Sequence, residues 1–246
     1  MTFLYMEPLT QRQIQILKNI VEEYIKTADP VGSDNLDRKF SLGISPATIR
    51  NEMATLTSLG YLRQPHPSAG RIPSPRAMKF YVDQLMQEKQ LSVSEEVAAK
   101  QKVLDARQDF DHLMQGATRA LSQQTKSLCV GIAEEGGVWH SGYAHILENP
   151  EFYNIDVTMR VLSLLEEERR MREMFFGREW SEPVIVLFGE EMGWPHFEPV
   201  GIIACRFTAP RTNGTLAVIG STRLNYPVII PIVRYFSSLI TQTTQA

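Results

Sequence analysis

Residues 45–71 carry side chains whose types and spacing suit hydrogen bonding to nucleic-acid bases and phosphates. The amide of Asn51 can pair with adenine through two hydrogen bonds, and the guanidinium of Arg50 can reach guanine or a phosphate. If this stretch is helical, the low-relief face opposite its apolar side carries Ala47, Asn51, Ala54 and Ser58, with Thr48 and Thr55 on one flank and Arg50 on the other. Such a face fits a DNA major groove, which is about 12 Å wide.

A capped amphipathic helix must position these side chains. Ser45 is a favourable N-cap, and Pro46 suits the first helical turn. Apolar residues recur at helical spacing and predict one buried face, made of Ile49, Met53, Leu56 and Leu59. Gly60 ends the helix, and a turn rich in proline and glycine then joins two short predicted strands, 61–63 and 71–72. A helix followed directly by a hairpin with a basic tip is the layout of a winged helix-turn-helix.

The alternative to a DNA-binding module is an ordinary amphipathic surface helix followed by an ordinary hairpin. The local charge argues against this alternative. Between Arg38 and Lys79 there are seven basic residues and one acidic residue, whereas the whole chain of 246 residues has a net charge of -3. A basic excess confined to one segment indicates a local contact with a polyanion. It argues against a protein that coats nucleic acid along its whole surface. DNA binding through residues 38–79 is therefore the favoured interpretation.

Two further helices are predicted before this segment. Thr10 and Gln13 have the spacing of a capping box, and Asp29-Pro30 stops the helix that follows. Ser33 could be a plain cap of a second, short helix, or its hydroxyl and the helix N-terminus could face a phosphate. Three helices and a wing within about 75 residues form a complete small DNA-binding module.

Two segments carry a more specific pattern: ISPATIRNEMATLTSLGYL (44–62) and QPHPSAGRIPSPRAMKFYVD (64–83). They resemble the heat-inducible transcription repressors of the bacterial HrcA family. The resemblance implies a cytoplasmic repressor that binds an inverted-repeat operator upstream of chaperone genes and releases it on heat stress. The implied partners are double-stranded DNA and a second copy of the chain, and a GroEL-type chaperonin is a further candidate.

The resemblance also assigns roles by position. Thr48, Arg50 and Asn51 would face the operator. The wing would contribute His66, Ser68, Gly70 and Arg71. Gly70 is expected to have a positive φ or to bring the wing backbone close to the sugar-phosphate, whereas His66 either touches DNA or is only a turn residue. The complete set of predicted DNA-binding residues is Ser33, Ser45, Thr48, Arg50, Asn51, Thr55, His66, Ser68, Gly70 and Arg71. Arg76 and Lys79 are candidates for phosphate contact.

The predicted domains are a winged-helix DNA-binding domain (1–86), a linker with a long helix (87–127) and a GAF-like regulatory and dimerisation domain (128–246). The long helix runs from about residue 95 to 126. Along one of its faces, near coiled-coil spacing, lie Val103, Phe110, Met114, Ala117 and Leu121. This stripe is either a dimer seam or the side of a helix that covers the second domain's sheet.

Short runs rich in β-branched residues predict strands at 128–133, 184–188, 200–207 and 215–220. Helices are predicted at 155–176 and after Tyr226-Pro227. The fold class is therefore α+β, and the second domain resembles the GAF-like domain of the same family. This sequence departs from the family at residues 134–139, where further strands and an inserted dimerisation segment are expected. The alternative function is a one-component transcription factor whose GAF-like domain senses a small molecule.

No pattern of catalytic residues is present. The five histidines are scattered without HExxH spacing, and Cys129 and Cys205 both lie inside apolar runs, as buried thiols do. The sequence predicts no enzyme, metal site or cofactor, and no apolar run approaches the roughly 20 residues that span a membrane. Residues 1–9 lack a signal-peptide pattern. Arg211, Arg223, Asn225 and Tyr226 could face an effector or partner, or lie at a domain interface.

Overall fold

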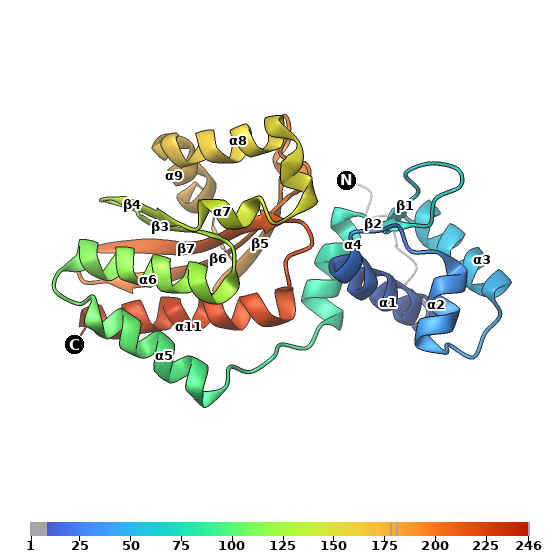
Figure 1. Ribbon diagram of the computed structural model, residues 1–246, viewed down its shortest axis with the longest axis horizontal. Coiled ribbons are helices and arrows are strands. Elements are labelled where there is room, and N and C mark those ends of the chain that lie inside the picture. The colour runs from blue at the N-terminus through green and yellow to red at the C-terminus, as the bar shows by residue number, and fades with distance from the viewer. Residues whose placement is uncertain (1–8, 178, 181, 246) are drawn as a thin grey trace. The chain divides into compact units, whose positions relative to one another are not determined.

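The computed structural model describes residues 9–177, 179–180 and 182–245, and the chain divides into two compact units, 1–86 and 87–246 (Figure 1). The predicted α+β class is confirmed, with a winged helix followed by a mixed helix and sheet domain. The expectation about a signal peptide concerns a segment that, apart from Leu9, lies outside the described residues. In the described part of the chain, no helix has both the length and the apolar character that crossing a membrane requires.

The first unit is built around three helices and a small hairpin, with two shorter helical segments after the hairpin. Helix α1 (Gln11–Thr27) begins with the predicted capping box between Thr10 and Gln13. Helices α2 (Ser33–Phe40) and α3 (Pro46–Ser58) follow, then β1 (Leu62–Arg63), β2 (Ile72–Pro73), α4 (Pro75–Phe80) and the π-helix η1 (Tyr81–Leu85). Fully buried side chains from the three helices form the core: Ile16, Leu17, Ile20, Leu36, Ile49 and Leu56.

An antiparallel sheet forms the centre of the second unit. Its strands are β3 (Leu128–Ala133), β4 (Val138–Ser141), β5 (Val184–Phe188), β6 (Val200–Ala209) and β7 (Thr212–Ser221), in the order β4-β3-β7-β6-β5. Helices α6 (Phe110–Thr125) and α11 (Tyr226–Gln245) cover one face, and α8 (Ile155–Glu166) and α9 (Glu168–Phe176) lie over the other (Figure 1). The remaining helices are α5 (Val93–Asp105), α7 (Tyr143–Ile146), η2 (Pro150–Tyr153) and α10 (Gly189–Met192).

The prediction of one long helix over 95–126 is wrong. The chain breaks after Asp105 and restarts at Phe110, where the Asp109 carboxylate accepts a hydrogen bond from the His112 backbone amide at 2.9 Å. That bond and one from the His112 ring lower the pKa of Asp109. The break lets α5 fold back on α6, and the stripe proposed as a dimer seam is packed inside this unit. Its buried members are Val103, Met114, Ala117 and Leu121.

Two other elements differ from expectation. The helix predicted over 155–176 is divided at Glu167, whose ψ of 64° is not helical. Strand β4 was not predicted, because its four residues mix polar and aromatic types. It pairs with β3 through a short turn, and the Arg172 guanidinium closes that turn by donating to the carbonyls of Ala133, Glu134 (2.7 Å) and Gly136 (2.6 Å). A compact hairpin thus occupies residues 134–137.

Both cysteines are free and buried, as the sequence indicates. Burial raises the pKa of the Cys129 thiol to about 12 and also raises that of Cys205. Among the described residues, no group of three or more His, Cys, Asp or Glu side chains could hold a metal ion.

Candidate nucleic-acid interface

Helix α3 presents a polar, small-residue face to solvent. Its N-cap, Ser45, accepts a hydrogen bond from the Thr48 amide at 3.2 Å, and the two side-chain oxygens lie 3.0 Å apart. Ile49, Met53 and Leu56 are buried beneath the helix. The exposed residues are Ala47, Arg50, Asn51, Ala54, Thr55 and Ser58. The buried and exposed faces of α3 are therefore those that the helical spacing predicts. Leu59 is the exception, because it was predicted to be buried and is exposed at the end of the helix.

Asn51 is the exposed side chain of α3 best placed to read a base. Its amide has no hydrogen-bond partner within the described residues, so both its donor and its acceptor remain available. Thr55 and Ser58 differ, because their hydroxyls donate to backbone carbonyls of their own helix, at 3.2 Å and 2.7 Å. They can offer only acceptor atoms or small surfaces to a ligand.

Arg50 points toward α2 and away from the outer face of α3. Its Nη2 lies 3.5 Å from the Ser33 hydroxyl oxygen, and Ser33 is buried at the start of α2. The expectation that Ser33 caps this helix is wrong. Gly32 occupies the N-cap position and makes no side-chain capping bond. Ser33 instead lies at an eight-residue helix's N-terminus, where the amide groups favour an anion.

The wing is braced by its own side chains. The Gln64 amide donates to the carbonyls of Pro67 at 2.8 Å and Ala69 at 3.0 Å. His66 and Ser68 are exposed, and the His66 Nδ1 lies 3.1 Å from the Ser68 hydroxyl. His66 and Ser68 therefore face solvent on an ordered turn. Gln64, which was not predicted as a site residue, holds that turn together.

The base of the wing is fastened to the segment before α2. Val31 and Arg71 exchange two backbone hydrogen bonds of 2.9 Å. Gly70, next to this bridge, does not have the positive φ that was one expectation. Glycine is needed because a Cβ there would lie 2.4 Å from the Val31 carbonyl oxygen. The close approach is to the protein's own backbone, which fixes the wing beside α2.

Replacing Gly70 with Ala should therefore destabilise the first unit. Relieving the contact with Val31 must open the bridge, and we expect a loss of about 1–3 kcal/mol in the free energy of unfolding. Urea unfolding followed by circular dichroism measures this. Ser68→Ala, an exposed wing substitution nearby, should change stability by less than about 0.5 kcal/mol. Equal stability of the two variants would contradict the steric explanation.

The other basic residues serve different purposes. Arg71 is half-buried and donates from Nε to the Thr57 hydroxyl at 3.1 Å, which ties the wing to α3. The Arg76 guanidinium lies 4.4 Å from the centre of the Tyr61 ring and donates to the Leu59 carbonyl at 2.7 Å. Arg76 therefore satisfies a carbonyl at the end of α3, and its phosphate contact stays a prediction.

A cleft of about 570 Å³ lies between the start of α2, helix α3 and the wing. It brings together five predicted residues, which are Ser33, Arg50, Ser68, Gly70 and Arg71. It also includes Asn35, Arg38 and Gln64, which were not predicted as site residues. In the sequence, Arg38 counts only toward the basic excess. It reaches the cleft because it lies one helical turn after Asp34, which also lines the cleft. Three guanidinium groups around one groove suit a phosphate backbone.

Together these features define a winged-helix protein with a groove suited to a polyanion. Sequence comparison gives the family. Residues 8–90 match the family described as "Winged helix-turn-helix transcription repressor, HrcA DNA-binding", and residues 75–230 match "HrcA protein C terminal domain". The chain belongs to the HrcA family.

The relatives are similar over different lengths. The heat-inducible transcription repressor HrcA of Carboxydothermus hydrogenoformans is 27% identical over 335 aligned positions, covering 95% of this chain and 98% of that protein. The Clostridium perfringens repressor of the same name is 42% identical over 123 residues, covering 50% of this chain and 36% of that protein. An alignment of 335 positions exceeds this chain's 246 residues, so the Carboxydothermus protein carries segments without a counterpart here.

A solved structure supports the fold. The crystal structure of a hypothetical protein at 2.2 Å resolution matches with a TM-score of 0.76 and 16% sequence identity, covering 96% of this chain and 99% of that one. At 16% identity, this similarity is evidence for the fold alone.

Proposed function

We propose that this protein is a sequence-specific, DNA-binding repressor of heat-shock genes that binds an inverted-repeat operator as a homodimer and releases it on heat stress. One observation carries the proposal: the Asn51 amide, without a partner in the described part of the chain, lies on a helix beside a groove lined by three arginines. Similarity to proteins named heat-inducible transcription repressors supports the regulatory role. Such a repressor would act in the cytoplasm, on the chromosome, and would need no catalytic residue.

In the proposed complex, α3 enters the major groove and Asn51 reads a base edge through its amide. Arg50, directed toward Ser33, binds a backbone phosphate together with Arg38 and the N-terminus of α2. The wing then follows the adjacent backbone through His66 and Ser68. Phosphate contacts fix the register, and the α3 face supplies sequence preference.

The remaining two-thirds of the chain would pair two copies and control their release. Binding two half-sites at once raises affinity far above that of either half-site, so losing the pairing on warming would free the operator. Marginal stability of the second unit would suffice for this response. A GroEL-type chaperonin is the protein partner we propose for keeping the repressor folded.

Fluorescence anisotropy with a labelled duplex tests the proposal. The duplex should contain an inverted repeat taken from upstream of this organism's chaperonin genes, and a scrambled duplex of equal length and composition is the comparison. We expect specific binding about 10³-fold or more tighter than binding to the scrambled duplex. Equal affinity for the two duplexes would remove the claim of sequence specificity.

Arg38 should contribute through charge alone. Replacing it with Gln should weaken binding to both duplexes and make the slope of log K against log salt shallower by about 0.9 per half-site. Lys100→Gln, an exposed lysine on α5, is the charge-matched control and should leave the slope unchanged. Loss of preference between the duplexes in Arg38→Gln would instead mean that Arg38 reads bases.

A specific observation supports the alternative of a small-molecule sensor. A cleft of about 770 Å³ in the second unit has Phe110 and Trp139 in its wall, with their ring centroids 5.6 Å apart, and Arg107 and Arg211 beside them. Its volume is within the range of ligand sites, about 300–1,000 Å³. A thermal-shift screen of metabolites, with Trp139→Ala as control, tests it. Stabilisation of wild type but not of Trp139→Ala would favour the sensor.

A further inference from the structure

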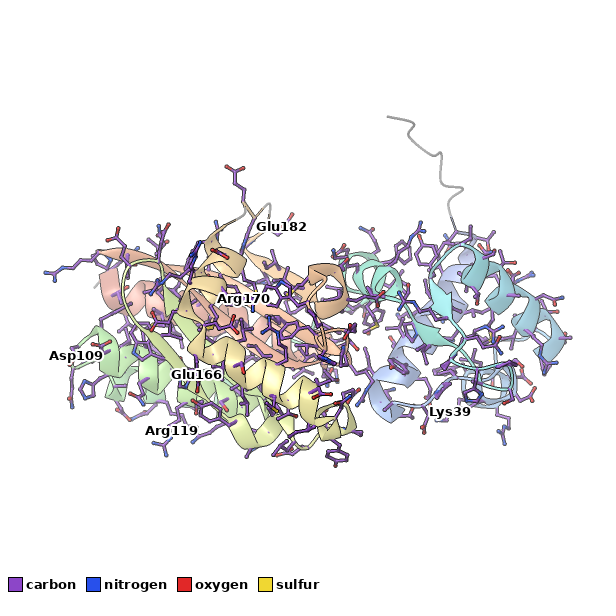
Figure 2. The ribbon with its side chains drawn as sticks, turned by 90° about the horizontal axis from the view of Figure 1, so that it is seen from above. Lys39, Asp109, Arg119, Glu166, Arg170 and Glu182 are labelled. Carbon is purple, nitrogen blue, oxygen red and sulfur yellow. The ribbon has the colours of Figure 1, made fainter. Side chains whose placement is uncertain are left out.

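One face of α8 is apolar and open to solvent. Ile155, Met159 and Leu162 are 65%, 59% and 37% exposed, at a spacing of four and then three residues that aligns them along one stripe. Tyr153, two residues before the start of the helix, is a further exposed apolar side chain at this end, 72% exposed. The opposite side of the helix is buried over the sheet through Val157, Val161, Leu164 and Leu165. Figure 2 looks onto this layer, with Glu166 labelled at the end of α8.

The stripe, here meaning Tyr153, Ile155, Met159 and Leu162, has the size that a dimer contact needs. With about 200 Å² for a fully exposed large side chain, it presents roughly 450 Å² of apolar surface. That is within the range of the largest apolar patch on a typical monomer, about 300–600 Å², and such patches are often functional. A standard interface buries about 800 Å² per partner, slightly more than half of it non-polar. The stripe alone can supply that non-polar share.

A second exposed apolar helix face, on α5, is smaller. On α5, Val93 and Val97 are 77% and 58% exposed. The positions that would continue their stripe by another turn are Lys100 and Gln101, both polar and exposed. Pairing through α5 would bury these groups for little apolar gain. The stripe on α8 is the stronger candidate for a partner.

We propose that the stripe on α8 packs against the same stripe of a second copy of this chain, antiparallel and two-fold symmetric about a point near Met159. In such a contact the same patch meets itself, so Ile155 lies against Leu162 of the partner subunit. This inference rests on the proposed function, in which a dimer matches an inverted repeat. It places the dimer contact on α8, which this chain has. The inserted dimerisation segment expected near residues 134–139 is replaced by a compact hairpin at 134–137.

Charge selects the antiparallel direction. In a parallel contact, Asp156 and Glu166 would each stand beside the identical carboxylate of the other copy, which is unfavourable. Antiparallel packing about Met159 offsets the two Asp156 carboxylates by six residues, roughly 9 Å along the helix axis. It also brings each Glu166 toward the N-terminal end of the other α8, where the helix dipole favours a negative charge.

Light scattering on the full chain, at micromolar concentration, tests the proposal. Wild type should have the mass of two chains. The double variant Ile155→Glu, Met159→Glu should have the mass of one, because its added carboxylates would be buried together in the contact. Val97→Glu, the matched charge change on α5, should remain a dimer. Circular dichroism should be unchanged in both variants, since all three positions are exposed.

Cross-linking gives a second measurement that does not depend on disrupting the contact. Because Cys129 and Cys205 are buried, a new thiol in Met159→Cys is the accessible one. Near a two-fold axis it should form a disulfide with its own copy on mild oxidation, which requires Cα atoms within about 7 Å. Val97→Cys should stay reduced. A linked dimer from Val97→Cys alone would overturn the proposal.

DNA binding separates this inference from the proposed function. The double variant should bind a half-site duplex as wild type does and lose at least 10-fold in affinity for the inverted repeat. A double variant that remains dimeric overturns the α8 contact and leaves the repressor standing. A monomeric wild type overturns the contact and the dimeric binding mode. If the double variant is a monomer and wild type shows no preference for the operator, the α8 contact is supported and the proposed function is refuted.

Discussion

Replacing Asn51 with Ala should lower affinity for the inverted-repeat operator by about 1–3 kcal/mol per half-site, and by about twice that for a dimer on both half-sites. The reason is that the Asn51 amide is exposed on α3 and has no partner within the described residues. A free carboxamide can give and accept one hydrogen bond at the same adenine, which no hydroxyl on this helix can match. Anisotropy titrations with operator and scrambled duplexes measure the loss.

The loss should be specific as well as large. Affinity for the scrambled duplex should change little, because the phosphate contacts that we propose for Arg38 and Arg50 would remain. Preference should relax at a single base position of each half-site, which a set of singly substituted operators detects. Asn213→Ala, an exposed asparagine of β7, is the matched control and should bind as wild type. If Asn51→Ala keeps the full operator preference, α3 does not read bases through this residue.

The second large effect concerns the stability of the second unit. Replacing Arg223 with Met should lower its free energy of unfolding by about 3–5 kcal/mol. Arg223 binds Glu151 through two hydrogen bonds, Nε to Oε1 at 2.5 Å and Nη2 to Oε2 at 2.9 Å. The two side chains are only 8% and 17% exposed, so the substitution would leave a carboxylate largely shielded from water without its cation. Arg223 thus joins the loop after β7 to η2, directly before α8.

Urea unfolding measures this loss of stability, and two further variants serve as comparisons. Arg169→Met breaks the pair with Glu173, but Arg169 is 92% exposed and the loss should be within about 0.5 kcal/mol. The double variant Arg223→Met, Glu151→Leu removes both charges and should recover most of the stability lost in Arg223→Met. An Arg223→Met protein as stable as Arg169→Met would show that the pair contributes no more than a surface contact.

Features that depend on neighbouring residues could be predicted from the sequence. The capping box at Thr10, the Ser45-Pro46 start of α3 and the buried residues from Ile49 to Leu56 follow from caps and helical period, which act within a few residues. The apolar strands β3 and β5 were predicted with their observed bounds, since runs of β-branched residues have few other uses. The charge excess and the wing motif indicated DNA binding for the same local reason.

Tertiary structure alone decided the rest. The approach of Gly70 to Val31 and of Arg50 to Ser33 joins residues 39 and 17 positions apart, so no local pattern could reveal the groove or explain the glycine. The same holds for the turn that breaks the predicted long helix and buries its stripe, and for the apolar face that α8 leaves open. Periodicity shows that a helix has an apolar side, but which apolar residues are covered depends on what the folded chain places against them.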